Sequence, residues 1–268
     1  KLNHKFLVLF FGAQCPWHKW VIEQTRLAAT QVKGTIKIID AIKNPEIAAQ
    51  YRLFCPFMIV IDDTIRLSSP FSANELVKIA KGGVTAKPTL LQSLGPEARA
   101  ERIEPLTAKN ILETCSTCNR ARDSPEYQAK VEWALKFQND LPEEIMGFIA
   151  FEGKKAVSYV EFLPALKIPY PLPKKSKTLA VINCIYPLED GPDYRSYVLE
   201  YLIKYLPKHG FKKLQVISGR RTLTPNRQVS FFISHGFKEI GEVDSIVLKR
   251  GKDELVLMEK NLLKSNPY

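Results

Sequence analysis

The six consecutive apolar residues Phe6 to Phe11 constrain the fold more than any other feature near the start of the sequence. A continuous apolar run of this length is typical of a strand covered on both faces, as in the sheets of α/β proteins. The sequence therefore predicts a buried strand at 6–11. No small-residue cleavage site sets the run apart from a mature domain, so we interpret it as part of the fold and not as a signal peptide.

Further short apolar runs alternate with helical patterns up to residue 83. The patterns predict helices at 17–32, 44–51 and 72–81 and strands at 35–40, 57–62 and 65–67. Asn44 and Pro45 are expected to begin the second of these helices, and Gly82 and Gly83 to end the third. The following stretch, 84–100, contains Pro88, Gly95 and Pro96 and predicts a linker, with a domain boundary near residue 95.

The remainder of the chain predicts a second α/β unit. Strands are expected at 101–106, 146–151, 156–162, 178–186, 213–217, 238–243 and 255–260, and helices at 108–114, 125–139, 194–206 and 227–235. Thr107 is expected to cap the first of these helices. The expected organisation is a domain at 1–83, a linker at 84–100 and a domain at 101–268.

Composition limits the classes of function. The net charge is +11, but the basic residues are dispersed and no nucleic-acid-binding motif is present, so we expect a solvated surface or attraction of an anionic ligand. No apolar run is long enough to span a bilayer. Five cysteines, an odd number, argue against a secreted disulfide framework and favour a cytoplasmic protein. The oligomeric state is left open.

A cysteine turn follows the first predicted strand. The segment Phe10-Phe11-Gly12-Ala13-Gln14-Cys15-Pro16-Trp17-His18 leads from that strand into a helix, and Cys55-Pro56-Phe57 leads into another strand. In this order, residues 5–83 resemble thioredoxin-fold proteins. The resemblance implies a cis-proline turn at Pro56 that packs beside Cys15.

The cysteine turn departs from the thioredoxin pattern at its second cysteine position, which is His18. The usual Cys-x-x-Cys disulfide cannot form there. A helix amino terminus favours the Cys15 thiolate. The resemblance implies that Cys15, His18 and Cys55 converge. Such a group could bind zinc or copper, or form a Cys15–Cys55 disulfide. The alternative is an inert remnant of the site, with Cys55 in the core.

The second unit resembles the GCN5-related N-acetyltransferase (GNAT) superfamily over 101–262. The match consists of the element order, the segment 229–237 ending in Gly236-Phe237, the hairpin that includes Val157 to Glu161, and Met258-Glu259-Lys260. The expected fold class is therefore α/β, with a thioredoxin-like N-terminal domain and a GNAT-like C-terminal domain.

The GNAT resemblance also implies a site for acetyl-CoA. The strand at 178–186, with Ile185 and Tyr186, would pair with the pantetheine arm, and the turn with Gly191, Arg195 and Ser196 would hold the pyrophosphate. In this sequence Asp193 and Arg195 stand where glycines are expected. Pro192 removes an amide donor.

Three residues are candidates for acyl-transfer chemistry in the second unit. Glu161 is the candidate general base, and Cys184 lies on the strand where a thioester would arrive. The tyrosine that often acts as general acid is replaced by Phe232, so Tyr194 is the candidate substitute, with Tyr197 and Tyr201 as alternatives.

A second pair of cysteines, Cys115 and Cys118, follows the first helix of the second unit. Together with Cys184 they are a candidate thiol, metal or redox site. The alternative is a structural helix end.

Three functions follow from these residues. The first is an acetyl-CoA-dependent N-acyltransferase acting on a small-molecule or protein amine, with an accessory thioredoxin-like domain. The second is a cysteine-based protein that holds a metal or a soft electrophile. The third is a non-catalytic pseudo-enzyme whose cleft binds a partner.

Overall fold

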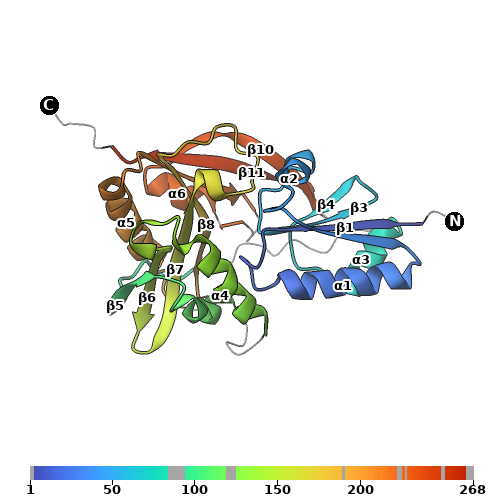
Figure 1. Ribbon diagram of the computed structural model, residues 1–268, viewed down its shortest axis with the longest axis horizontal. Helices are drawn as coiled ribbons and strands as arrows, with labels where there is room; N and C mark the ends of the chain where they lie inside the picture. Colours follow the sequence, from blue (N-terminus) through green and yellow to red (C-terminus); the bar gives the residue numbers. More distant parts are fainter. Residues whose placement is uncertain are drawn as a thin grey trace.

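The computed structural model shows a mixed α/β chain with two sheets side by side (Figure 1). It describes residues 3–83, 94–118, 125–188, 191–221, 225–226, 228–248 and 251–263. The described helices include none that is long and apolar enough to cross a membrane.

The first half contains a sheet with the strand order β2-β1-β3-β4. Its strands are β1 (Lys5–Phe10), β2 (Thr35–Asp40), β3 (Phe57–Ile61) and β4 (Ile65–Leu67). The helices are α1 (His18–Gln31), α2 (Pro45–Gln50) and α3 (Ala73–Ala80). β1 is parallel to β2 and antiparallel to β3, which in turn is antiparallel to β4.

The apolar run in β1 serves two cores because successive side chains of a strand point to opposite faces. Phe6 and Val8 pack with the apolar side chains of α1 and α3. Leu7 and Leu9 join a larger core that continues into the second half of the chain. From Phe6 to Phe10 the strand is therefore apolar at every position, because both of its faces are covered.

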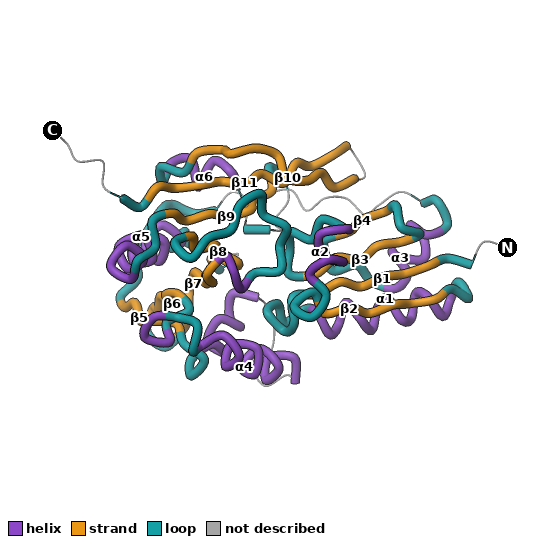
Figure 2. Tube along the Cα trace, turned by 45° about the horizontal axis from the view of Figure 1, so that its top comes forward, coloured by secondary structure: helices purple, strands orange, loops and turns teal. Residues whose placement is uncertain are grey.

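The second half contains a sheet with the strand order β5-β6-β7-β8-β9-β11-β10. Its strands are β5 (Arg102–Leu106), β6 (Gly147–Glu152), β7 (Lys155–Pro164), β8 (Leu179–Pro187), β9 (Lys213–Gly219), β10 (Lys238–Leu248) and β11 (Gly251–Asn261). Its helices are α4 (Pro125–Gln138), α5 (Arg195–Tyr205), α6 (Val229–Ser234) and the 3-10 helices η1 (Ile111–Cys118), η2 (Pro142–Glu144), η3 (Ala165–Lys167) and η4 (Leu206–His209). Figures 1 and 2 show α4 and α5 on opposite sides of β6 and β7.

The two central strands of this sheet, β8 and β9, diverge. They are the parallel pair of the sheet, and their pairing ends at Ile182 and Val216 although both strands continue. The later part of β8, from Cys184 to Pro187, pairs with β7 alone among the described strands.

The two halves share one apolar core. The ring of Phe11, just after β1, meets the rings of Trp133, Phe137 and Tyr170 at centroid distances of 5.6, 5.9 and 5.9 Å. A second contact lies at the top of Figure 1, where the β10–β11 hairpin reaches β4 and the Arg66 guanidinium donates two hydrogen bonds of 2.8 Å to Asp244.

Most of the predicted elements are present within two residues of their expected ends, but three differ. The helix predicted at 108–114 was wrong in type and position, because 111–118 forms the 3-10 helix η1. The Thr114 and Thr117 hydroxyls there donate to carbonyls three residues earlier, which competes with α-helical hydrogen bonding. β10 and β11 extend well beyond the predicted strands because Asp244 and Asp253 interrupt the apolar pattern.

Candidate functional site between the two halves

A buried ion pair lies where the first half meets β7 and α4. Glu161 and Lys130 are 0% and 1% exposed, and Lys130 Nζ donates to Glu161 Oε2 over 2.7 Å. The other carboxylate oxygen, Oε1, accepts from Gln14 Nε2 at 2.9 Å and from Asn183 Nδ2. The predicted general base Glu161 thus accepts hydrogen bonds from three side chains, which come from both halves of the chain.

The turn that carries Gln14 is fixed by its own backbone and by the second half. Gln14 N–H donates to Phe11 O over 3.2 Å, and Gln14 O accepts from Lys130 Nζ over 2.7 Å. Gly12 has φ of 50°, and a Cβ added there would come within 3.0 Å of Trp133. A side chain larger than hydrogen at position 12 would therefore push the turn away from α4.

Cys184, on β8, lies beside Glu161 in the cross-strand register of β7 and β8. Its sulfur and the Tyr159 hydroxyl are 2.8 Å apart in a hydrogen bond, and both side chains are buried. Nearby, burial raises the pKa of Tyr170 well above its usual value, and the Cys55, Cys184 and Cys15 sulfurs add to the shift. The two halves therefore bring thiols from both sides close to one buried tyrosine.

The predicted metal site at Cys15, His18 and Cys55 finds no support in the structure. The described residues contain no group of three or more histidine, cysteine or acidic side chains placed to hold a metal ion. His18 Nδ1 instead bonds to Cys15 O at 2.9 Å, and its ring stacks on Phe10. Cys55 is fully buried. The described residues therefore do not support a zinc or copper site here.

The thiol of Cys55 is expected to be inert in the folded protein. Burial raises its pKa to about 12, so only about one thiol in ten thousand is ionised near pH 8. Treatment of native protein with iodoacetamide, followed by mass spectrometry, should leave Cys55 unmodified, while the partly exposed Cys15 provides the internal control. Labelling of Cys55 as fast as in urea would contradict the buried position.

The predicted pyrophosphate turn is closed by the chain itself. The segment at 94–98 pairs with it, since Gly95 N–H donates to Gly191 O (3.1 Å) and Asp193 N–H donates to Pro96 O (3.0 Å). At the start of α5, Asp193 Oδ1 accepts from Arg195 N–H at 3.0 Å. A carboxylate of the chain thus lies at a helix amino terminus, where anions are stabilised.

Arg195 is held in place by the same carboxylate. Its Nε and Nη2 donate to Asp193 at 3.0 and 2.8 Å, and its guanidinium lies over the Phe231 ring at 4.1 Å. Arg195 and the neighbouring Ser196 are both buried. Arg195, the cation predicted to bind the cofactor, therefore has its charge neutralised by a carboxylate of the chain itself.

The strand residues predicted to bind the cofactor are also engaged. Ile185 N–H donates to Asn226 Oδ1 at 3.1 Å, and the Tyr186 hydroxyl accepts from Asn226 N–H at 3.0 Å. Asn226 Nδ2 donates in turn to Ile217 O on β9 at 3.0 Å. Asn226 therefore bridges the two diverging strands.

Tyr194 and Cys115, two of the remaining predicted residues, are both buried. Tyr194 precedes α5, and burial raises its pKa, with Glu152 raising it further. Cys115 is buried within η1, and the side chain of Cys118 lies outside the described residues. Whether these groups act in catalysis stays a prediction.

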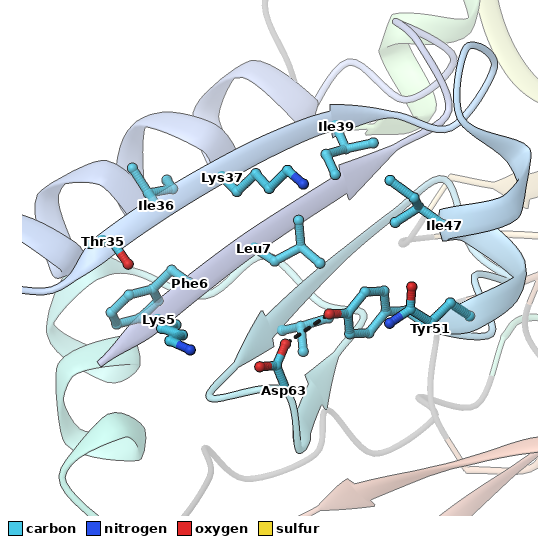
Figure 3. Close-up of a pocket in the computed structure, with 12 residues that line it drawn as sticks. Lys5, Phe6, Leu7, Thr35, Ile36, Lys37, Ile39, Ile47, Tyr51 and Asp63 are labelled. Atoms are coloured by element: carbon cyan, nitrogen blue, oxygen red, sulfur yellow. Dashed lines mark hydrogen bonds between the residues drawn. The ribbon is translucent and has the colours of Figure 1, made fainter. Parts of the chain in front are cut away.

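A groove of about 450 Å³ lies on the first sheet, away from all the predicted site residues. Figure 3 shows Leu7, Ile39 and Ile47 along it, with the Lys37 amine between Leu7 and Ile39 and with Lys5 near Phe6. Tyr51 donates to Asp63 at 2.7 Å at one end.

Comparisons with known proteins give structural similarity alone. No family model matches the sequence, and no curated protein matches it. An N-acetyltransferase from Staphylococcus aureus Mu50 is 16% identical with a TM-score of 0.44, and the alignment covers 60% of this chain and 98% of that one. The ribosomal-protein-S18-alanine N-acetyltransferase from Escherichia coli is 18% identical with a TM-score of 0.38, covering 62% and 98%. A ribosomal-protein-alanine N-acetyltransferase from Brucella melitensis is 16% identical with a TM-score of 0.41, covering 60% and 99%.

Proposed function

We propose that the chain is an N-acyltransferase of the GNAT type, with acetyl-CoA as donor, a primary amine as acceptor and a thioredoxin-like first half as accessory domain. The observation that carries the proposal is the divergence of the parallel strands β8 and β9 after Ile182 and Val216. Divergence exposes a strand edge inside a sheet, and such an edge can pair with an extended chain that contains amides. The pantetheine arm of coenzyme A is a chain of this kind.

Glu161 is the group best placed to receive a proton from an acceptor amine. Its carboxylate already binds one primary ammonium, that of Lys130. Its strand neighbour is Cys184, at the start of the diverging part of β8. Tyr194, whose pKa is raised by burial, remains protonated at neutral pH and can serve as a proton donor.

Binding of acetyl-CoA tests the proposal directly. Isothermal titration of the full chain with acetyl-CoA is expected to give saturable binding, and incubation with polyamines or peptide amines should then release free coenzyme A. Absence of binding at millimolar acetyl-CoA would exclude an acyltransferase that uses this donor.

A second candidate function is a non-catalytic binding protein on the same scaffold. The specific observation in its favour is that Asp193 occupies the anion position at α5, while Asn226 occupies the amide of Ile185. The GNAT resemblance implies that the cofactor would bind at these two positions. With Asp193 and Asn226 in place, the turn and the strand do not fit the cofactor.

The Asp193→Ala variant distinguishes the two candidates. Removal of this carboxylate frees the Arg195 guanidinium and the Arg195 N–H for a phosphate oxygen, and we expect about tenfold tighter binding of acetyl-CoA, equivalent to about 1.4 kcal/mol. The matched control is Asp140→Ala, because Asp140 pairs with Lys167 away from this turn. Equal affinities of wild type and both variants would favour the non-catalytic candidate.

A further inference from the structure

Lys130 is held by a set of groups that recognise an ammonium ion. Its Nζ donates to the Glu161 carboxylate and to Gln14 O, each at 2.7 Å, and lies 5.4 Å from the centre of the Trp133 ring. A carboxylate, a carbonyl and an aromatic face are the three kinds of partner that a primary ammonium uses. We call the residues around Lys130, namely Gln14, Trp133, Glu161 and Asn183, the ammonium cradle.

The cradle is built from both halves of the chain. Gln14 comes from the turn after β1, while Glu161, Asn183 and Trp133 come from β7, β8 and α4. Gln14 and Asn183 each donate to Glu161 Oε1, which orients the carboxylate toward Lys130. The opposite ends of these two amides, Gln14 Oε1 and Asn183 Oδ1, are buried and have no partner within the described part of the chain.

These two spare oxygens show that the cradle offers more acceptors than the contacts to Lys130 use. Burying an amide oxygen without a hydrogen bond is costly, so a ligand with additional N–H groups would fit the cradle at least as well as a lysine side chain. The cradle also adjoins the point where β8 leaves β9, because Glu161 pairs with Cys184 across the strands.

We propose that the cradle is a binding site for a primary alkylammonium group and that the Lys130 side chain occupies it as an internal ligand. An external amine binds only when Lys130 leaves. The identification of this external amine as the acyl acceptor rests on the acyltransferase function proposed above. The ammonium site itself does not depend on that function.

Chemical rescue of the full-length Lys130→Ala variant tests the proposal. Alanine keeps Cβ, so propylammonium supplies the three missing carbons and the nitrogen. We expect propylammonium chloride to raise the Tm of the variant saturably, by about 2–4 °C, and to leave wild type unchanged. Propanol, of the same length but uncharged, should raise it less. The matched control is Lys136→Ala, which removes an exposed lysine from the same helix and should show no response.

The outcomes separate this site from the acyltransferase function, because the measurement contains no acyl donor. If the variant does not fold without a ligand, it is refolded from urea in the presence of propylammonium or propanol. A yield of folded protein that rises with propylammonium but not with propanol supports the site. Equal effects of the two compounds, or no effect of either, would overturn it. Adding Gln14→Ala to Lys130→Ala should weaken the rescue, and an unchanged rescue would contradict the part assigned to the first half.

Discussion

Replacing Glu161 by alanine is expected to lower the free energy of unfolding by about 3–5 kcal/mol, because it leaves the Lys130 ammonium buried without its counter-charge. The pair is essentially inaccessible to water, with side chains 0% and 1% exposed. Urea denaturation followed by circular dichroism measures the change.

Two controls separate the loss of a charge partner from the loss of packing. The double variant Glu161→Leu with Lys130→Met removes both charges and should recover most of the stability lost in Glu161→Ala. Glu104→Ala breaks an exposed ion pair with Arg102 and should cost about 0–1 kcal/mol. A cost for Glu161→Ala as small as that for Glu104→Ala would show that Lys130 reaches water.

Replacing Phe11 by alanine is expected to destabilise both halves of the chain together, by about 3–5 kcal/mol. Phe11 is 0% exposed, and its ring meets Trp133, Phe137 and Tyr170 of the second half. Because the shared core links the two sheets, we expect the variant to unfold in one transition, at a lower urea concentration than wild type. Tryptophan fluorescence and circular dichroism measure this transition.

The neighbouring aromatic residue provides the matched control for Phe11. Phe10 is partly exposed, stacks on His18 and packs against the first half alone, so Phe10→Ala should cost less. The fluorescence of Trp133 and that of Trp17 and Trp20 report on different halves. Separate transitions for these probes in wild type would contradict a single cooperative unit.

The sequence predicted the elements well where the apolar pattern is strong. The run at 6–11 and the helix after it were found because the side chains from Phe6 to Leu9 are buried on one face of β1 or the other. The failures have local causes. Threonine hydroxyls favour a 3-10 helix in η1. Asp244 and Asp253 interrupt the apolar patterns of β10 and β11, and their partners Arg66 and Arg221 lie elsewhere in the chain.

The candidate site was found in part. Glu161 was singled out, but Lys130, Gln14 and Asn183 were not. Lys130 did leave a signal, since it shares the buried face of α4 with Tyr127, Ala134 and Phe137, where a lysine needs a charged partner. Gln14 left none, because its contact with Glu161 joins residues 147 positions apart. Contacts of that kind depend on the packing of one half against the other.

The segment at 94–98 affects how this protein can be re-engineered. Because Gly95 and Pro96 pair with Gly191 and Asp193, the segment at 94–98 is held in register against the turn before α5. A Cβ at position 95 would come within 2.5 Å of Gly191 O. We expect the insertion or deletion of one residue at 94–98 to shift the turn before α5, so insertions belong outside this segment.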